Sequence, residues 1–395
     1  MKKIFYLMTV LVALTLISCQ GAKTKMFAKF KGGKGQELET DVVVPFNLVA
    51  SHIIEVEAEI NGSIQTMVLD TGGLTMLDKS IADSLKMELI STTQNNVQLA
   101  ETDAILLQDV TVKGLKMGVI DFRNMFKFQH PGMIGSDYLR FFQSEYNYQE
   151  QTITFRNSQR LKKHTNNDYL MDIEIIFPYF PTVDVRINGK KTLPGLIDTG
   201  LHYAFVLPIS WMENLSEEEK KGLIEAEGFF AKWPTPAPPK SYLCKLDEIR
   251  FGDIVLKDIS VIFAELPSFL QQEVVLIGKY FLENYITILD YPKRKVMFTE
   301  VYNNNYTLSY SAGIMISKKN DKFYITGIWK NSPAAEFGIT PDTELQAING
   351  KSHADISQKE IMEMLMNKKV AKFYLRILRD GKEDEILLRK RDLFE

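Results

Sequence analysis

The chain has 395 residues, of which 45% are hydrophobic and 25% charged, a balance typical of globular domains. At roughly 100–200 residues per domain, this length predicts two to four domains. The formal net charge is -3, and lysine and arginine are dispersed along the sequence. Because binding of a nucleic-acid duplex normally needs a basic face, we exclude nucleic acid as a partner.

The N-terminal segment predicts an export signal. Two lysines follow the initial methionine and precede an apolar run from Ile4 to Ile17, shorter than the roughly 20 residues that a membrane-spanning helix needs. The Leu-Ile-Ser-Cys motif ending at Cys19 resembles a bacterial lipobox, in which the signal is cut before an acylated cysteine. We therefore expect a signal peptide over 1–18, lipidation at Cys19 and a flexible tether over 19–40. The resemblance implies a lipid-anchored protein of the bacterial cell envelope.

The middle of the chain contains an internal repeat. An Ile-Asn-Gly turn signal, followed by an apolar strand that ends in Asp-Thr-Gly, occurs at 60–72 and again at 187–200. A second shared block, in which Ile-Gly precedes an aromatic residue and leucine, occurs at 133–139 and at 276–282. In both copies this block precedes a hairpin-like pair of strands at the same spacing.

The repeat predicts two related β-rich lobes over 41–160 and 165–300. Helices are few: Asp78 can cap a short helix through Met87, and a capping box at Ser216 predicts a helix to about Ala226.

The two Asp-Thr-Gly loops resemble those of aspartic peptidases of the pepsin and retropepsin type. The resemblance covers both lobes, although only the two repeated blocks are sharp. It implies a mainly β fold with two lobes and a cleft between them, and a catalytic pair formed by Asp70 and Asp198. Two neighbouring carboxyl groups that share one proton can activate a water molecule and polarise a peptide carbonyl.

The resemblance also assigns supporting roles around the pair. The threonine hydroxyls would cross-link the two loops, the loop glycines would permit a tight turn, and two further glycines would leave room for a chain segment behind each loop. These residues are Thr71, Thr199, Gly72, Gly200, Gly135 and Gly278.

Two positions depart from the pattern. Many family members have serine, threonine or alanine after the loop glycine, whereas this chain has Gly73 and Leu201. A hydroxyl there would stabilise the charged carboxylate, so its absence predicts a higher pKa for the pair. The absence of this hydroxyl also leaves open the alternative that the protein has the peptidase fold but no catalytic activity.

The five histidines show no spacing typical of metal ligands, and His202 fits an ordinary loop residue or the lining of a subsite. The resemblance implies neither a metal nor a cofactor.

From about Tyr306 the pattern changes to that of a small α+β domain. Ser-Pro-Ala-Ala at 332–335, Gly-Ile at 338–339 and Ile-Asn-Gly at 348–350 resemble a PDZ domain over 306–393. In that family a loop and the following strand bind a peptide carboxylate and add a peptide strand. The corresponding residues are Ser311, Ala312, Gly313, Ile314 and Ile316, with a helix from about Ser357 to Met366 as the second wall. Whether this groove binds a partner or packs on the lobes stays open.

Together these patterns predict a membrane-tethered aspartic endopeptidase that acts on polypeptides, with the PDZ-like domain recruiting or gating substrate. The alternative is a catalytically inactive peptide-binding or scaffolding protein of the envelope. The distance between the Asp70 and Asp198 carboxyl groups discriminates between them.

Overall fold

We analysed a computed structural model of the chain, in which the described residues are 32–91, 98–126, 129–159, 161–176, 178–190, 192–228, 230, 240–266, 270, 273–302, 308–319, 321–379 and 381–395. The expected signal peptide, Cys19 and the first part of the tether lie outside these ranges. None of the helices within them is both long and apolar enough to cross a membrane.

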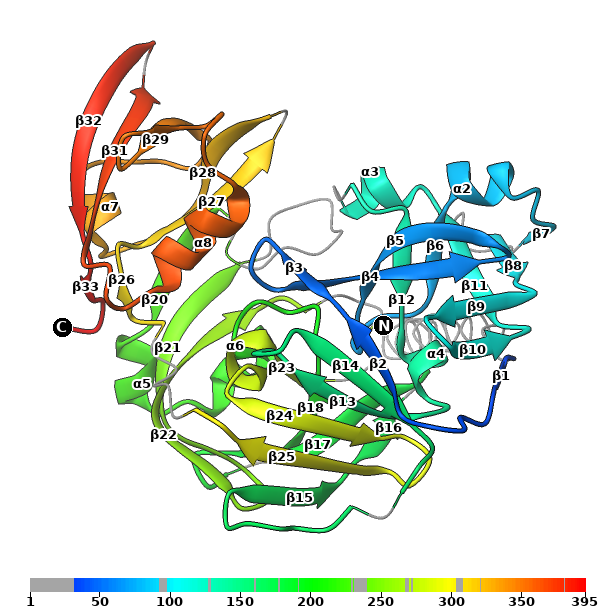
Figure 1. Cartoon of the computed structure of the whole chain (residues 1–395). Helices are drawn as coiled ribbons and strands as arrows, with labels where there is room; N and C mark the ends of the chain where they lie inside the picture. Colours follow the sequence, from blue (N-terminus) through cyan, green and yellow to red (C-terminus); the bar gives the residue numbers. More distant parts are fainter. Residues whose placement is uncertain are drawn as a thin grey trace, which may run out of the picture.

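The fold is mainly β, and its strands form sheets that curve into barrel and half-barrel shapes (Figure 1). The first repeat builds an 11-stranded sheet in the described part of the chain. Its strands are β1 (Lys34–Gly35), β3 (Asn47–Val49), β4 (Ile53–Ile60), β5 (Ser63–Leu69), β6 (Met76–Asp78), β7 (Leu89–Ser91), β8 (Gln98–Glu101), β9 (Ala104–Leu107), β10 (Val110–Lys113), β11 (Lys116–Ile120) and β12 (Gly132–Ile134). Short helices accompany it: α2 (Lys79–Ser84), α3 (Phe122–Phe126) and α4 (Ser136–Leu139).

The second repeat has the same local plan. Its strands are β16 (Glu174–Ile176), β17 (Phe180–Ile187), β18 (Thr192–Ile197), β19 (Phe205–Pro208), β20 (Ile224–Gly228), β21 (Ser241–Phe251), β22 (Ile254–Ala264) and β23 (Val275–Ile277). Its helical segments are a 3-10 turn (Ile209–Asn214), α5 (Glu217–Lys221) and α6 (Lys279–Leu282). Both expected Asn-Gly hairpins are confirmed: β4–β5 and β17–β18 turn at Asn61-Gly62 and Asn188-Gly189, with positive φ at all four residues.

A six-stranded sheet joins the two repeats, and in Figure 1 it lies below the 11-stranded sheet. Its described strands run in the order β15 (Asp168–Asp172), β25 (Lys295–Glu300), β24 (Tyr285–Asp290), β13 (Gln143–Asn147), β14 (Thr152–Arg156) and β2 (Val42–Pro45). The hairpins expected after the Ile-Gly blocks are therefore β13–β14 and β24–β25, and they meet where β13 pairs with β24. One apolar core runs through both repeats, from Phe46 and Phe155 to Phe205 and Phe298.

The C-terminal module has its own apolar core, in which Ile316, Ile325 and Phe373 are almost fully buried. Its elements are β26 (Tyr310–Ser311), β27 (Ile314–Lys319), β28 (Lys322–Trp329), α7 (Pro333–Glu336), β29 (Thr343–Ile348), β30 (Lys351–Ser352), α8 (Gln358–Met366), β31 (Lys372–Arg379), β32 (Lys382–Arg389) and β33 (Arg391–Asp392). The expected helix from Ser357 is confirmed as α8, with Ser357 forming a capping box with Glu360. The module is not a separate body, because β20 of the second repeat pairs with β28.

Two expectations were wrong. The capping box at Ser216 is present, but α5 ends at Lys221 with Gly222 as its C-cap, and β20 begins at Ile224, inside the stretch expected to be helical. The expected tether is too long, since Lys34 and Gly35 pair with β10 and Leu38 is buried. The packed chain therefore includes residues before 41.

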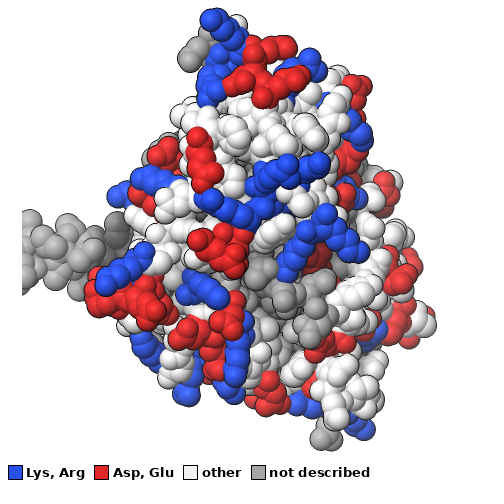
Figure 2. Space-filling view, turned by 90° about the vertical axis from the view of Figure 1, so that its left-hand side faces the viewer, with Lys and Arg blue, Asp and Glu red and all other residues white. Residues whose placement is uncertain are grey.

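Basic and acidic side chains both occur across the face shown in Figure 2. Such mixing is typical of a soluble protein surface.

Candidate active site

Asp70 and Asp198 occupy equivalent places in the two repeats. Each follows a buried strand, β5 or β18, that pairs in parallel with the strand before the Ile-Gly glycine, β12 or β23. The Asp70 amide donates to the Ile134 carbonyl at 2.9 Å, and the Asp198 amide donates to the Ile277 carbonyl at 2.9 Å. The repeated sequence blocks thus fix both aspartate backbones in the same way.

The two carboxyl groups lie close together between the loops. A Cβ atom built on Gly200 would lie 2.6 Å from Asp70 Oδ2, and one built on Gly72 would lie 2.6 Å from Asp198 Cγ. The Gly72 amide donates to Asp70 Oδ1 at 2.7 Å, and the Gly200 amide donates to Asp198 Oδ1 at 3.0 Å. Both positions therefore require glycine for lack of space, and the backbone amide at each position donates to the aspartate of its own loop.

Thr71 and Thr199 join the loops by a reciprocal pair of hydrogen bonds. The Thr71 amide donates to the Thr199 hydroxyl, and the Thr199 amide donates to the Thr71 hydroxyl, both at 3.0 Å. The Thr71 hydroxyl itself donates to the Ile197 carbonyl at 2.6 Å. Both threonines are almost fully buried, so water cannot readily replace these bonds. This arrangement fixes the two carboxyl groups relative to each other.

Gly135 and Gly278 lie where chain segments cross behind the two loops. A Cβ atom at Gly135 would lie 2.4 Å from the Gly73 carbonyl oxygen, and one at Gly278 would lie 2.2 Å from the Tyr203 carbonyl oxygen. Both contacts involve backbone that has little freedom to move. A side chain at either position would push the aspartate loop forward.

The surroundings favour a protonated form of the pair. Burial raises the pKa of both Asp70 and Asp198, and the charge of Asp70 raises the pKa of Asp198 further. Amide donors from the loop glycines oppose the effect of burial. Both residues nevertheless remain partly accessible to solvent. A raised pKa for both groups favours the state in which the pair holds one shared proton.

A brace behind the first loop was missed by sequence reasoning. Ser136, fully buried, donates its hydroxyl proton to the Thr71 carbonyl. Tyr291, from the end of β24, lies with its hydroxyl 3.1 Å from Ser136 Oγ. Because the serine proton is already used, the tyrosine is the donor in that pair. The second repeat has Lys279 at the equivalent position, and its side chain pairs with Glu283 instead.

Asp137, next to Ser136, holds the segment that follows the first loop. Its Oδ1 atom accepts from the Thr75 amide at 2.8 Å and from the Thr75 hydroxyl at 2.7 Å. Burial raises the pKa of Asp137 to about 6. In the second repeat the equivalent residue is Tyr280. The sequence shows only that the two repeats differ at both positions, and this difference does not identify the partners of Ser136 and Asp137.

His202 is more buried than a loop residue would be. Its ring lies 4.8 Å, centroid to centroid, from that of His52, which comes from the β3–β4 turn of the first repeat. Burial lowers the pKa of His52 to about 4, and burial together with the charges of His52 and Lys279 lowers the pKa of His202 well below its usual value. Two neutral imidazoles therefore pack between the repeats.

Gly73 and Leu201 differ in their contacts. Leu201 is buried in an apolar cluster, whereas Gly73 faces the Met133 side chain. A Cβ atom at Gly73 would lie 2.5 Å from Met133 Sδ and 3.1 Å from Asp70 Oδ2. The space beside Asp70 that a serine would occupy is thus filled by a flexible methionine.

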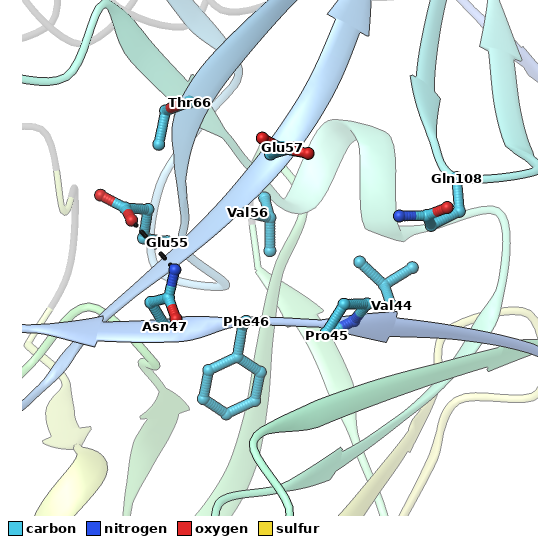
Figure 3. Close-up of a pocket in the computed structure, with 9 residues that line it drawn as sticks. All are labelled: Val44, Pro45, Phe46, Asn47, Glu55, Val56, Glu57, Thr66 and Gln108. Atoms are coloured by element: carbon cyan, nitrogen blue, oxygen red, sulfur yellow. Dashed lines mark hydrogen bonds between the residues drawn. The ribbon is translucent and has the colours of Figure 1, made fainter.

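A cavity of about 320 Å³ on the first repeat does not include either aspartate (Figure 3). In it the Asn47 amide donates to Glu55 at 3.4 Å, and Glu55 also pairs with His130 at 2.7 Å. Its lining is Val44, Pro45, Phe46, Asn47, Glu55, Val56, Glu57, Thr66 and Gln108. Among the described residues no group of three or more His, Cys, Asp or Glu side chains could hold a metal ion.

The residues expected to bind a peptide carboxylate follow one another around the turn before β27. The Gly313 amide already has a partner within the turn, because it donates to the Ser311 hydroxyl at 2.9 Å. Gly313 has a φ of 84°, and a Cβ atom there would lie 2.0 Å from Ser332 Cβ. Ala312 is buried, and Ile314 and Ile316 are buried in β27. The turn is therefore closely packed and requires glycine.

No family model matches the chain, and no curated protein matches its sequence.

Proposed function

We propose that the protein is an aspartic endopeptidase, tethered to a membrane of the bacterial cell envelope through a lipid on Cys19. The observation that supports it best is the facing pair of Asp70 and Asp198, held by equivalent loops of two repeats. In this proposal the ionised carboxylate takes a proton from water, and the protonated carboxyl group donates to the peptide carbonyl. The two groups act as one unit with a shared titration.

Residues around the pair support this chemistry because they hold the two carboxyl groups in fixed positions. The Thr71–Thr199 bonds and the Ser136 brace keep the carboxyl groups in position without rearrangement during the reaction. The raised pKa of the pair favours activity at mildly acidic rather than strongly acidic pH. In the same proposal the C-terminal module is a PDZ-like domain, and the groove between β27 and α8 binds polypeptide ends.

A catalytically inactive peptide-binding protein is the second candidate, and one observation favours it. Leu74 and Leu99 of the first repeat share an apolar cluster with Phe180 and Leu201 of the second. Apolar contact between the repeats beside the loops narrows the space available for a substrate. A statine-type inhibitor, which resembles the hydrated peptide bond, separates the two candidates by binding only to an accessible pair.

Replacement of either aspartate tests the proposal directly. We expect Asp70→Asn and Asp198→Asn each to remove nearly all hydrolysis of a mixed peptide library assayed from pH 4 to 8. The double variant should be little worse than either single one, since residues that act as a unit are not additive. Wild-type activity should be bell-shaped in pH.

The variants should also keep their fold, because asparagine is nearly isosteric with aspartate. Each carboxyl group has a higher pKa in the folded than in the unfolded state. The free energy of unfolding therefore falls as pH rises from the pKa of the unfolded state to that of the folded state. Removal of the charge should therefore leave stability at neutral pH unchanged or improved. Hydrolysis that survives in the double variant, or a folded wild type that cleaves nothing, would refute the peptidase.

A further inference from the structure

The groove of the C-terminal module is closed at one end by the second repeat. The groove lies between β27 and α8, and its end is formed by Met315 of β27 and Met366 of α8 together with their neighbours. The opposite wall of the same pocket comes from the second repeat, as Tyr203, Phe230 and Ile262. The volume of the space left between these walls is only about 30 Å³. Such a space holds one or two water molecules but not an apolar side chain.

Several contacts hold the closing wall in place. The Phe230 ring stacks on Trp329 with centroids 3.8 Å apart and planes 21° apart. The Phe230 carbonyl accepts a hydrogen bond from the Tyr203 hydroxyl at 2.7 Å. From the other side of the groove, the Tyr280 hydroxyl donates to the Met366 carbonyl at 3.1 Å.

The strand β20 brings Phe230 to the groove. It pairs with the edge of β28 through Ala226 and Trp329, Glu227 and Ile328, and Gly228 and Gly327, which places green β20 beside β28 in Figure 1. An ion pair between Lys330 and Glu225 at 2.6 Å lies next to this pairing. Gly228 has a φ of 79°, and a Cβ atom there would lie 2.2 Å from the Thr326 carbonyl oxygen. The close approach of the two strands therefore depends on glycine.

We infer that Phe230 is an intramolecular plug, which a peptide ending in an apolar residue must displace before its last side chain can enter the groove between β27 and α8. The inference rests on the proposed PDZ-like role of that groove but not on the proposed hydrolysis. It identifies the occupant of the groove in the resting protein as the chain's own second repeat.

The plug also connects the groove to the candidate active site. Tyr203, which holds the Phe230 carbonyl, lies on the segment that follows the Asp198 loop. The Tyr203 carbonyl is the atom that faces the missing side chain of Gly278 behind that loop. Tyr203 therefore contacts the plug through its hydroxyl and the crossing behind the Asp198 loop through its carbonyl.

The inference about Phe230 can be tested by measuring how accessible a cysteine introduced at the end of the groove is to a thiol reagent. Met366 packs against the apolar cluster that contains Tyr203, Phe230 and Trp329, and it is not part of the core of its own module. Its burial therefore reports on the wall that closes the groove. We would place Met366→Cys in the full chain with Cys19→Ser. The remaining native thiol, Cys244, is buried, and burial raises its pKa to about 12, which keeps it unreactive. The probe is N-ethylmaleimide, and the readout is the rate of alkylation.

We expect the groove thiol to react at least tenfold more slowly than a reference thiol at Lys318→Cys, an exposed position on the same strand β27. Phe230→Ala should raise the groove rate about tenfold. The matched control is Phe337→Ala, an exposed phenylalanine on the same module, which should leave the rate unchanged. Gly228→Ala, which separates β20 from β28 without touching the ring, should act like Phe230→Ala and serves in its place if that variant loses its cooperative thermal transition.

Equal rates for the groove thiol and the reference thiol in the otherwise wild-type chain would overturn the inference. So would a rate unaffected by both opening variants. The alkylation rate does not depend on peptide hydrolysis. If the protein cleaves peptides but does not show the expected alkylation rates, only the inference about Phe230 is rejected. A protein that shows the expected rates but cleaves no peptide rejects only the peptidase.

Discussion

At the scale of single residues, the position after the first aspartate loop is where this chain departs most simply from the aspartic-peptidase pattern on which the proposed function rests. Gly73 leaves Asp70 without a hydroxyl donor, and Met133 occupies the adjoining space. The contact that a new Cβ would make is with the end of a flexible side chain, which can move aside. The carboxyl group can therefore be given a hydroxyl without disturbance of the backbone.

Gly73→Ser should lower the pKa of the pair. A serine hydroxyl beside Asp70 donates to the charged carboxylate, and a bond of that kind is worth enough to shift the acidic limb of the activity profile by roughly one pH unit downward. The measurement is kcat/KM against pH. Gly73→Ala is the matched control, since it displaces Met133 equally but has no hydroxyl. A shift of the same size in both variants would assign the effect to packing.

The pairing of the two Asp-Thr-Gly loops could be predicted from sequence because it depends on short local motifs. Asp70, Thr71 and Gly72 recur as Asp198, Thr199 and Gly200, and their mutual contacts follow from the repeat. The Ser136–Tyr291 pair could not be predicted in this way, since its members are 155 positions apart and only one repeat has the serine. The His52–His202 contact could not be predicted either, because the two loops lie in different repeats and neither sequence indicates that they meet.

At the scale of elements, the strand and turn patterns were informative and the ends of elements were not. Asn61-Gly62 and Asn188-Gly189 define hairpins through their own backbone preferences. The capping box at Ser216 also formed, but Gly222 ended the helix and the next residues joined a sheet. That outcome depends on β21 and β28, which are distant in sequence. Local signals cannot report such a pairing.

The glycine behind the second loop should be intolerant of substitution. Gly278→Ala places a Cβ atom against the Tyr203 carbonyl, so the loop that carries Asp198 or the segment behind it must move. We expect a loss of roughly 1–3 kcal/mol in the free energy of unfolding, as for other overpacked sites. Urea unfolding followed by far-UV circular dichroism provides the value.

Gly222→Ala is a suitable comparison for this test. Gly222 has a φ of −80°, and the nearest atom to a Cβ there would be 3.5 Å away. Its substitution should change stability by no more than about 0.5 kcal/mol. If Gly278→Ala were equally mild, the close crossing behind the loop would not be a constraint.

At the scale of the whole molecule, attachment to a membrane is proposed from sequence alone. Cys19→Ser should block acylation, because the thiol that receives the lipid is lost. We expect the variant to move from the detergent phase to the aqueous phase on partitioning, and to lose labelling by a fatty-acid probe. Retention of the label in Cys19→Ser would show that the lipid, if any, is elsewhere.

The two repeats should unfold together rather than as separate domains. They share one apolar core, and the six-stranded sheet joins β13 of the first to β24 of the second. Asp290, fully buried at the end of β24, accepts from the Gln143 amide at 2.8 Å and from the Ser158 hydroxyl at 2.8 Å. It also accepts from the Lys293 amide at 3.0 Å. One carboxylate therefore fastens the first repeat to the second.

Asp290→Ala should consequently destabilise the whole two-repeat unit. The substitution leaves donors from both repeats without their charged acceptor, which we expect to lower the free energy of unfolding by roughly 2–4 kcal/mol. Hydrolysis should decline in parallel with the folded fraction, since Asp70 and Asp198 keep their loops only while the repeats stay joined. Asp172→Ala, at an exposed carboxylate of β15 in the same sheet, is the control and should be nearly neutral. Unfolding followed both by tryptophan fluorescence and by far-UV circular dichroism should give one coincident transition in each protein. Two separated transitions, or a loss confined to one repeat, would show that the repeats are independent and that the paired aspartates rely on the loops alone.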